Sequence, residues 1–365
     1  MAMRRRVRLL AVGLLGVLVA ATMSACEPPP AVRIQSVVPN LDFPAAFTID
    51  PNNVIIWYAE RNTGEIRRRN LLNGVDELVW TVPNLLTSGE QGLLGLALDP
   101  NYPSTRSVYA YASRSVGGVA HNQVLRIALN TNFIGTGQAA IFDQLGGPGD
   151  HHVGGRLQAG PDGRIYVVIG EHTNPANAQN LGNTSGKVLR MLTNGGVPSD
   201  NPISGSRIFA YGIRNSFGFD FDPANGRLWG TDNGPTCNDE VNRIVGGGNY
   251  AWGPNATCST PPSPPQNTNQ DGPNRRLPLR FYGDSVGITG AVFCDDCGID
   301  GLERKLLVAA LTGNIRVLTL DGDRTGVSAD QLLIDHSSGV ISMESRPGEP
   351  VYFSTTTGIF RLLPG

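Results

Sequence analysis

The fold of this chain can be inferred from one short segment, Leu157-Gln-Ala-Gly-Pro-Asp-Gly-Arg-Ile-Tyr166. An apolar strand leads into a turn of Gly, Pro and Asp, and a second strand follows that carries an aromatic residue. Turn residues of this kind allow the chain to reverse, and the flanking residues have the character of strands. The segment therefore predicts a β-hairpin.

The same pattern occurs five more times along the chain. The other copies are Phe47-Thr-Ile-Asp-Pro-Asn-Asn-Val-Ile-Ile-Trp-Tyr58, Leu96-Ala-Leu-Asp-Pro-Asn-Tyr102 with Ser107-Val-Tyr-Ala-Tyr111, Phe219-Asp-Phe-Asp-Pro-Ala-Asn-Gly-Arg-Leu-Trp229, Gly290-Ala-Val-Phe293 with Lys305-Leu-Leu-Val-Ala309, and Ile341-Ser-Met-Glu-Ser-Arg-Pro-Gly-Glu-Pro-Val-Tyr352. Spacings of roughly 40 to 60 residues are typical of propeller blades. Six copies predict an all-β chain: one six-bladed β-propeller of four-stranded antiparallel blades over residues 34–365. A sandwich or a solenoid is the alternative, although a solenoid would need shorter and more regular repeats.

The composition agrees with many turns and short strands. The chain has 46 glycines, 26 prolines and 16% charged residues, and we find no convincing amphipathic helix. Loss of the four arginines near the N-terminus would take the formal charge from −2 to about −6. This mild acidity argues against nucleic acid as a partner.

The N-terminus has the pattern of an export signal. Arginines within the first eight residues precede an apolar run at 9–21, and Ser24-Ala25 then precede Cys26. We interpret 1–25 as the signal, Cys26 as a lipidated residue of the bacterial lipoprotein type, and 26–33 as a tether. An ordinary cleaved signal is the alternative, because Met23 stands where a leucine is usual.

Four further cysteines are an even number in an exported protein, which indicates two disulfides. Local pairing of Cys237 with Cys258 and of Cys294 with Cys297 is preferred. A four-thiolate zinc site is the alternative, although zinc sites usually have two close cysteine pairs and this chain has one.

A histidine, an arginine and a carboxylate flank the hairpin predicted at 157–166. They stand in His152-Val-Gly-Gly-Arg156 and in Gly170-Glu171. Histidine is suited to moving protons near neutral pH, and a carboxylate one strand away can hold its tautomer.

Several ordered motifs are similar to those of the soluble, PQQ-dependent glucose/sorbosone (aldose sugar) dehydrogenases. They are Gly89-Glu-Gln-Gly-Leu-Leu-Gly-Leu-Ala-Leu-Asp-Pro100, the His152 to Leu157 motif, Gly186-Lys-Val-Leu-Arg190, Tyr211-Gly-Ile-Arg-Asn215, Asp232-Asn-Gly-Pro235, Asp239-Glu-Val-Asn242 and Gly247-Gly-Asn-Tyr-Ala-Trp252. The resemblance runs from about residue 34 to the C-terminus and is strongest over 88–252. It implies a six-bladed propeller with a site at one mouth.

The resemblance also implies catalytic roles. His152 would take the proton of the sugar C1 hydroxyl, Glu171 would orient the histidine, and Arg214 would stand beside the quinone carbonyls. The resemblance further implies that PQQ is bound by Gln91, Arg214, Asn215 and Asn233. Asn233 stands where the family usually has Gln or His.

Calcium is the second cofactor that the resemblance implies. Carbonyl groups of Gly234 and Pro235 would bind an ion that polarises PQQ. Glu240 and the backbone carbonyl of Tyr250 would belong to a second, structural site.

The late blades depart from the family pattern. Thr312 stands where the family has a lysine, and Gly339 and Ile341 stand where it has an Arg-x-Arg pair. PQQ carries three carboxylates, and a buried trianion needs cations around it.

The expected function is therefore that of an exported, membrane-anchored oxidoreductase that oxidises an aldose at C1 to a lactone and passes electrons to an unknown acceptor. One alternative is a non-catalytic, calcium-stabilised propeller that binds a ligand or partner at the cell surface, which the missing cations favour. A calcium-dependent hydrolase such as a lactonase is a third, less supported reading.

Overall fold

A computed structural model describes residues 28–147 and 149–365 of the chain. The expected export signal and Cys26 lie outside the described residues. Within the described ranges, none of the helices has the length and apolar character needed to cross a membrane.

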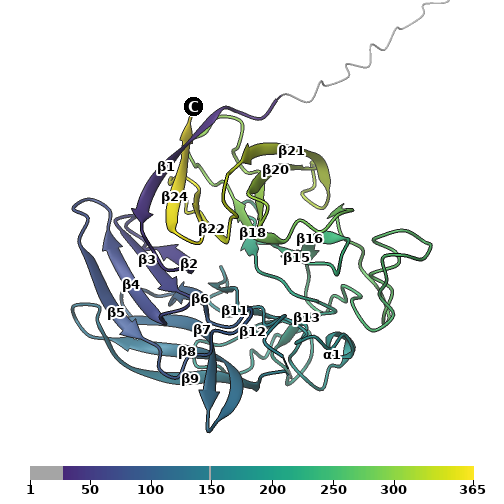
Figure 1. Cartoon of the computed structure of the whole chain (residues 1–365), viewed down its shortest axis with the longest axis horizontal. Helices are drawn as coiled ribbons and strands as arrows, with labels where there is room; N and C mark the ends of the chain where they lie inside the picture. The colour runs from purple at the N-terminus through teal and green to yellow at the C-terminus, as the bar shows by residue number, and fades with distance from the viewer. Residues whose placement is uncertain (1–27, 148) are drawn as a thin grey trace, which may run out of the picture.

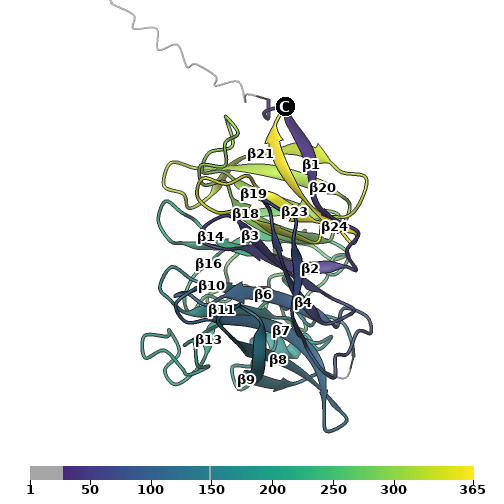
Figure 2. The ribbon, with the colours of Figure 1, turned by 90° about the vertical axis from the view of Figure 1, so that its left-hand side faces the viewer.

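The described residues form six four-stranded antiparallel sheets arranged in a ring, with the sheets surrounding a common centre in Figure 1 and seen from the side in Figure 2. Blades 1 to 3 consist of β2 (Pro44–Ile49), β3 (Ile55–Glu60), β4 (Glu65–Asn70) and β5 (Asp76–Thr81); β6 (Leu93–Leu98), β7 (Ser107–Val116), β8 (Val119–Leu129) and β9 (Gly135–Leu145); and β10 (Leu157–Ala159), β11 (Ile165–Ile169), β12 (Lys187–Met191) and β13 (Ile208–Tyr211). Blades 4 to 6 consist of β14 (Phe219–Phe221), β15 (Leu228–Asp232), β16 (Asp239–Ile244) and β17 (Arg280–Tyr282); β18 (Ile288–Phe293), β19 (Leu306–Ala310), β20 (Asn314–Leu320) and β21 (Val327–Asp335); and β22 (Ser342–Glu344), β23 (Tyr352–Ser354), β24 (Gly358–Pro364) and β1 (Val32–Pro39).

The six-bladed propeller predicted from the repeats is confirmed. Each sequence copy forms the first two strands of one blade, from β2 and β3 in blade 1 to β22 and β23 in blade 6. Neighbouring first strands contact each other around the centre, as β2 does with β6 and with β22. A short helix, α1 (Ala176–Gln179), lies between β11 and β12.

Side chains point alternately to the two faces of each strand, and both faces of every blade are buried. In β3, Trp57 and Ala59 pack into a core shared with blade 2, whereas Ile56 and Tyr58 pack into a core shared with blade 6. Successive side chains of a strand point to opposite faces, so a strand with two buried faces is a continuous apolar run. Six such clusters lie between the six pairs of adjacent blades.

The ring closes through the N-terminal strand. β1 pairs with β24 from Val32 opposite Pro364 to Pro39 opposite Gly358, and the two strands lie side by side at the top of Figure 1. The outer strand of blade 6 thus comes from the opposite end of the chain from its inner strands. The propeller begins at Val32, two residues before the expected boundary at 34.

Both predicted disulfides are present. Cys237 bonds to Cys258, and Cys294 bonds to Cys297. All four sulfur atoms are therefore used in covalent bonds, and the zinc alternative is excluded for these cysteines.

Arg156 connects two opposite blades across the centre of the ring. It precedes β10 in blade 3, and its guanidinium donates to Ser342 Oγ at 2.8 Å, to the Met343 carbonyl at 2.9 Å and to Glu344 Oε2 at 3.0 Å, all in β22 of blade 6. The pair is buried. A buried ion pair contributes little over an apolar replacement of both partners, but loss of one partner leaves the other charge unpaired.

Arg156→Ala should therefore destabilise the fold by about 3–5 kcal/mol, because the Glu344 carboxylate would remain buried without its cation. Urea unfolding followed by circular dichroism measures the change. The control is Arg304→Ala, since Arg304 is exposed and makes only a 3.8 Å surface pair with Glu303. Equal stability of the two variants would contradict the role assigned to Arg156.

Candidate active site

A cavity of about 230 Å³ lies at one mouth of the central channel. Every blade contributes to its wall through residues that precede or open an innermost strand or that directly follow the second strand. One lining residue from each blade in order is Arg61, Glu90, Gly154, Phe217, Leu311 and Ile341. The channel mouth is thus the place where loops that are distant in sequence come together.

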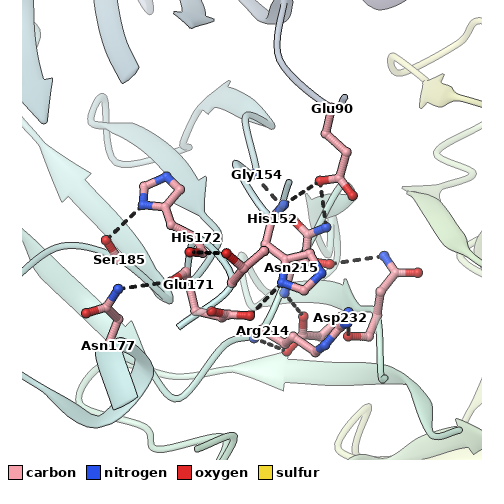
Figure 3. Close-up of polar contacts among 12 residues, drawn as sticks. Glu90, His152, Gly154, Glu171, His172, Asn177, Ser185, Arg214, Asn215 and Asp232 are labelled. Carbon is pink, nitrogen blue, oxygen red and sulfur yellow. Dashed lines mark hydrogen bonds and ion pairs between the residues drawn. The ribbon is translucent and has the colours of Figure 1, made fainter. Parts of the chain in front are cut away.

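His152 and Glu171 are in direct contact, and the N–H of His152 donates to Glu90, which lines the cavity. His152 precedes β10, Glu171 follows β11, and His152 Nδ1 is 2.5 Å from Glu171 Oε1 (Figure 3). The side chain of Glu171 is 1% exposed, whereas that of His152 is 17% exposed. Because Nδ1 is engaged by the carboxylate, Nε2 is the nitrogen available to accept a proton from a ligand.

The backbone around His152 explains why a glycine precedes Glu171. His152 has a positive φ of 54°, and its N–H donates to Glu90 Oε2 at 2.8 Å. A Cβ on Gly170 would lie 2.1 Å from the His152 carbonyl oxygen, so only glycine allows the chain that leaves β11 to pass this close. Gly170 therefore brings Glu171 within reach of the histidine.

Arg214 and Asn215 are held in place through their backbone N–H groups. Their N–H groups donate to the two carboxylate oxygens of Asp232 at 2.8 Å and 2.7 Å. The side chain of Asn215 donates to Glu90 Oε2 at 3.0 Å, so Glu90 joins His152 and Asn215 (Figure 3). Glu171 is tied to the same segment, since its N–H donates to the Arg214 carbonyl at 2.9 Å.

Burial shifts the pKa values of two charged side chains in this segment, Arg214 and Asp232. Burial lowers the pKa of the Arg214 guanidinium, and the surrounding carboxylates, Asp232 first among them, oppose that shift. Burial raises the pKa of the Asp232 carboxyl to about 7, against the two backbone hydrogen bonds that it accepts. The Arg214 guanidinium also lies over the Trp252 ring at 5.4 Å, which fixes its position further.

The other two predicted cofactor-binding residues are buried nearby. Asn233 donates through Nδ2 to the carbonyls of Asn215 at 3.0 Å and Ile288 at 2.8 Å, which fastens blade 4 to blade 5. The N–H of Gln91 donates to the Ser88 carbonyl at 2.8 Å, and its neighbour Glu90 lines the cavity.

The predicted metal-binding residues lie in two adjoining regions. The N–H of Gly234, which precedes Pro235, donates to Asp239 Oδ1 at 2.9 Å. Glu240 is buried and accepts from Asn238 at 2.5 Å and from Asn242 at 2.8 Å. No cluster of three or more His, Cys, Asp or Glu side chains suited to a metal occurs among the residues that the structure describes.

Glu240 and the carbonyl of Tyr250 meet through a network of amide side chains. Asn269 donates to the Tyr250 carbonyl at 2.7 Å, and its Oδ1 lies 2.8 Å from the Asn238 amide. Thr268 also lies against that amide. The network therefore joins two segments that were expected to share one site, and it adds oxygen-bearing residues that the sequence did not identify.

One of the three late-blade positions without the family cations takes part in the cavity wall. Ile341 lines the cavity, as expected from its position, but Leu311 rather than the exposed Thr312 lines it from blade 5. The wall is apolar at these two places. Arg61, from blade 1, is a cation of the cavity that the sequence did not identify.

Three further residues were missed by sequence reasoning. Glu90 and Asp232 stand within the quoted motifs, but a single sequence does not show that their carboxylates converge on the histidine and arginine segments. His172 is buried, with Nε2 2.8 Å from the Asn122 amide and Nδ1 3.1 Å from Ser185 Oγ. Its place directly after Glu171 was the one available indication.

Comparison with known proteins identifies the family of this chain. The Glucose / Sorbosone dehydrogenase family model matches residues 41–362, which is most of the chain. The chain belongs to this family. The resemblance inferred from the motifs is therefore confirmed.

Individual relatives cover the chain to different extents. The aldose sugar dehydrogenase YliI of Escherichia coli (strain K12) is 28% identical over 348 residues, which cover 92% of this chain and 93% of the relative. The quinoprotein glucose dehydrogenase B of Acinetobacter calcoaceticus is 33% identical over 246 residues, which cover 59% of this chain and 51% of the relative. The solved soluble aldose sugar dehydrogenase of Escherichia coli in the apo-form has a TM-score of 0.79 at 27% identity, covering 92% of this chain and all of that chain.

In this member of the family, His172 should make stability depend on pH. Burial lowers the pKa of the His172 imidazole from 6.5 to about 4, with a further contribution from His152. The unfolded chain then binds more protons than the folded one between these values, so the unfolding free energy falls as pH falls from 6.5 to 4. Urea unfolding at several pH values should show a smaller loss for His172→Gln than for the wild type.

The matched control is His151→Gln, because the His151 side chain is 58% exposed and should leave the wild-type slope unchanged. Identical slopes for His172→Gln and the wild type would show that His172 is protonated as easily in the folded protein as in the unfolded chain.

Proposed function

We propose that this protein oxidises the C1 hydroxyl of an aldose sugar to a lactone, with PQQ as the acceptor of the hydride. The observation that carries the proposal is the His152–Glu171 hydrogen bond beside a cavity at the channel mouth. Membership of the family and the aldose sugar and quinoprotein glucose dehydrogenases among its relatives support the substrate class and the cofactor.

In the proposed reaction His152 is the general base. Its Nε2 would take the proton of the C1 hydroxyl while hydrogen leaves C1 with its two electrons. Glu171 would stabilise the imidazolium that forms, because its buried carboxylate is already bonded to Nδ1. Arg214 and Asn215, anchored by Asp232, would orient the oxygen atoms of the bound cofactor.

The residues present fit PQQ through a set that differs from the family pattern. Apolar side chains such as Leu94 and Phe217 can cover a flat ring, and Arg61 offers a positive charge from blade 1. The Arg61 guanidinium donates to the neutral acceptors Asn62 Oδ1 and the Gly89 carbonyl, so its charge has no carboxylate hydrogen-bonded to it among the described residues. Bound PQQ would supply the two-electron acceptor, and Arg61 would bind one of its carboxylates.

The network around Glu240 fits a calcium ion. The Asn238 amide nitrogen has two hydrogens, yet oxygens of Glu240, Thr268 and Asn269 all surround it. Within the described chain, the buried oxygens Asn238 Oδ1 and Asn242 Oδ1 have no hydrogen-bond partner. Converging carboxylate, amide and hydroxyl oxygens with spare lone pairs are the donors that calcium takes. We infer a structural calcium site here, with Tyr250 contributing its carbonyl, and a second ion at the carbonyls of Gly234 and Pro235 beside the cofactor.

A non-catalytic propeller remains the second candidate function. The apolar Ile341 favours it, because it lines the cavity at a position where the family pattern has an arginine, and the neighbouring wall from blade 5 is the apolar Leu311. The retained His152–Glu171 contact and the anchored Arg214 segment favour the enzyme. Binding of PQQ to the purified protein distinguishes the two.

We further propose that the protein is exported and anchored to the membrane through a lipid on Cys26, with its electrons passing to an acceptor outside the cytoplasm. The N-terminal arginines, apolar run and Cys26 support this location. Membrane fractionation of Cys26→Ser tests it, since the variant should be released from the membrane fraction.

Replacement of the proposed base tests the chemistry. His152→Ala should lower aldose-dependent dye reduction by at least about 100-fold, the contribution expected of a general base. PQQ binding, measured by calorimetric titration of the apoprotein with calcium present, should stay close to that of the wild type. His151→Ala is the matched control, because His151 is the adjacent and more exposed histidine and pairs with Asp150.

Normal turnover by His152→Ala would remove the assigned role from this residue. Failure of the wild-type protein to bind PQQ at micromolar concentrations would instead favour the non-catalytic propeller.

Calcium should raise the thermal stability of the apoprotein through the Glu240 network. A free calcium concentration 100 times the Kd would add about 2.7 kcal/mol to the unfolding free energy, because the ion binds the folded chain. Glu240→Gln should lose most of the difference in Tm between calcium and a chelator. Glu77→Gln, which changes a half-exposed surface carboxylate, should keep that difference.

A further inference from the structure

Lys187, the first residue of β12, carries a charge that the proposed reaction does not use. Its side chain is 0% exposed, and within the described ranges no carboxylate is paired with it. Burial lowers the pKa of this ammonium to about 7. A buried cation without a counter-charge is costly, so its retention depends on the groups around it.

Three backbone carbonyls surround the Lys187 ammonium. Nζ donates to the carbonyls of Asn177 at 2.7 Å, Ala178 at 3.1 Å and Ser185 at 2.6 Å. Three acceptors need three N–H donors, which the ammonium has and the neutral amine lacks. All three carbonyls belong to the connection between β11 and β12, which also carries Glu171. The ammonium therefore fastens this connection to the first residue of β12.

One link leads from this connection to the proposed base. The Asn177 side chain donates through Nδ2 to the Glu171 carbonyl at 3.0 Å, as Figure 3 shows. The side chain of Glu171 in turn contacts His152 Nδ1 at 2.5 Å. Asn177 is thus held by Lys187 through its own carbonyl, and it holds the backbone of Glu171 through its amide.

A second link leads to the segment of Arg214. The Ala178 carbonyl accepts from the Gly212 N–H at 3.0 Å as well as from Lys187. Gly212 lies two residues before Arg214. A Cβ on Gly186 would lie 2.7 Å from Ala178 Cα, so the chain entering β12 passes directly against α1. The same ammonium therefore fastens a carbonyl on which the Arg214 segment also depends.

The helix α1 joins these links, and it has little stability of its own. It is four residues long, and the last carbonyls of a helix lack partners within the helix. Lys187 supplies a partner for two of these carbonyls. Gln179, the last residue of α1, donates to the Trp252 carbonyl at 2.7 Å, and the Trp252 ring lies under the Arg214 guanidinium.

We propose that Lys187 is a positioning residue, whose ammonium fixes α1 and through it the placement of Glu171 against His152. The inference rests on the proposed function, in which His152 is the base. Lys187 acts through Asn177, and its own contacts are with backbone carbonyls. An apolar side chain of similar length would fill the space without the cost of a buried charge, so filling alone does not account for a lysine here.

The test uses Lys187→Met, which keeps the approximate length of the side chain and removes the ammonium. In the apoprotein, the proton between His152 Nδ1 and Glu171 gives a downfield ¹H NMR resonance, which is assigned by its loss in His152→Ala. In Lys187→Met this resonance should move upfield or disappear through exchange with water. Lys305→Met is the matched control, because Lys305 precedes β19 in blade 5, and it should keep the resonance.

A second variant, Asn177→Ala, breaks the link to Glu171 but leaves the backbone carbonyl that Lys187 bonds. It tests the same path independently of how well Lys187→Met folds, and its resonance should change in the same direction. With PQQ and an aldose, both variants should lower kcat by about 10- to 100-fold, the effect of misplaced catalytic groups. KM should change little, because alignment rather than binding is lost.

An unchanged His152 resonance in the folded variants would overturn the proposal, whatever their turnover. Normal turnover by His152→Ala, together with an altered resonance in Lys187→Met and Asn177→Ala, would remove His152 as the base but would support the role of Lys187 in placing Glu171. The failure of the proposed function is thus distinguished from the failure of this inference.

Discussion

Every blade of this protein has two apolar faces, and neither face can be covered within the blade itself. Trp57 and Tyr58 show why: they are neighbours on one strand, but they pack into cores on opposite sides of blade 1. Burial of apolar surface is the main favourable contribution to folding, so each sheet needs a neighbour on both sides. A closed ring meets this requirement for all six blades at once. Pairing of β1 with β24 completes the last blade with a strand from the other end of the chain.

This packing constraint also builds the site. Because first strands contact one another around the centre, the loops at their ends are brought to the channel mouth from every blade. Glu90, His152 and Asn215 come from blades 2, 3 and 4, yet one carboxylate oxygen of Glu90 bonds to the other two. The site therefore depends on the ring as a whole, and its polar contacts are made at an edge where the apolar cores end.

A buried ion pair divides the interior of the channel into two cavities. Arg156 reaches from blade 3 to blade 6, and the pair with Glu344 separates an apolar cavity beside His152 from a polar cavity at the far mouth. A buried pair of this kind is costly to break, which suits a fixed partition better than a moving gate. The same arginine belongs to the motif that carries His152, so one short segment supplies both the proposed base and the partition.

The linear order of residues was enough to predict the blades and the family, and it favoured the disulfide partners that the structure confirms. The reason is that strand alternation, turn residues and short cysteine spacings are local, and each blade hairpin repeats them. Part of the site followed from the same motifs, as His152 and Glu171 flank one hairpin and do meet. The partners of Glu90, the place of Leu311 in the cavity wall, and the network around Glu240 did not follow from it. Those contacts join residues from different blades or from distant loops, and they exist because the ring closes and fixes the distances between them.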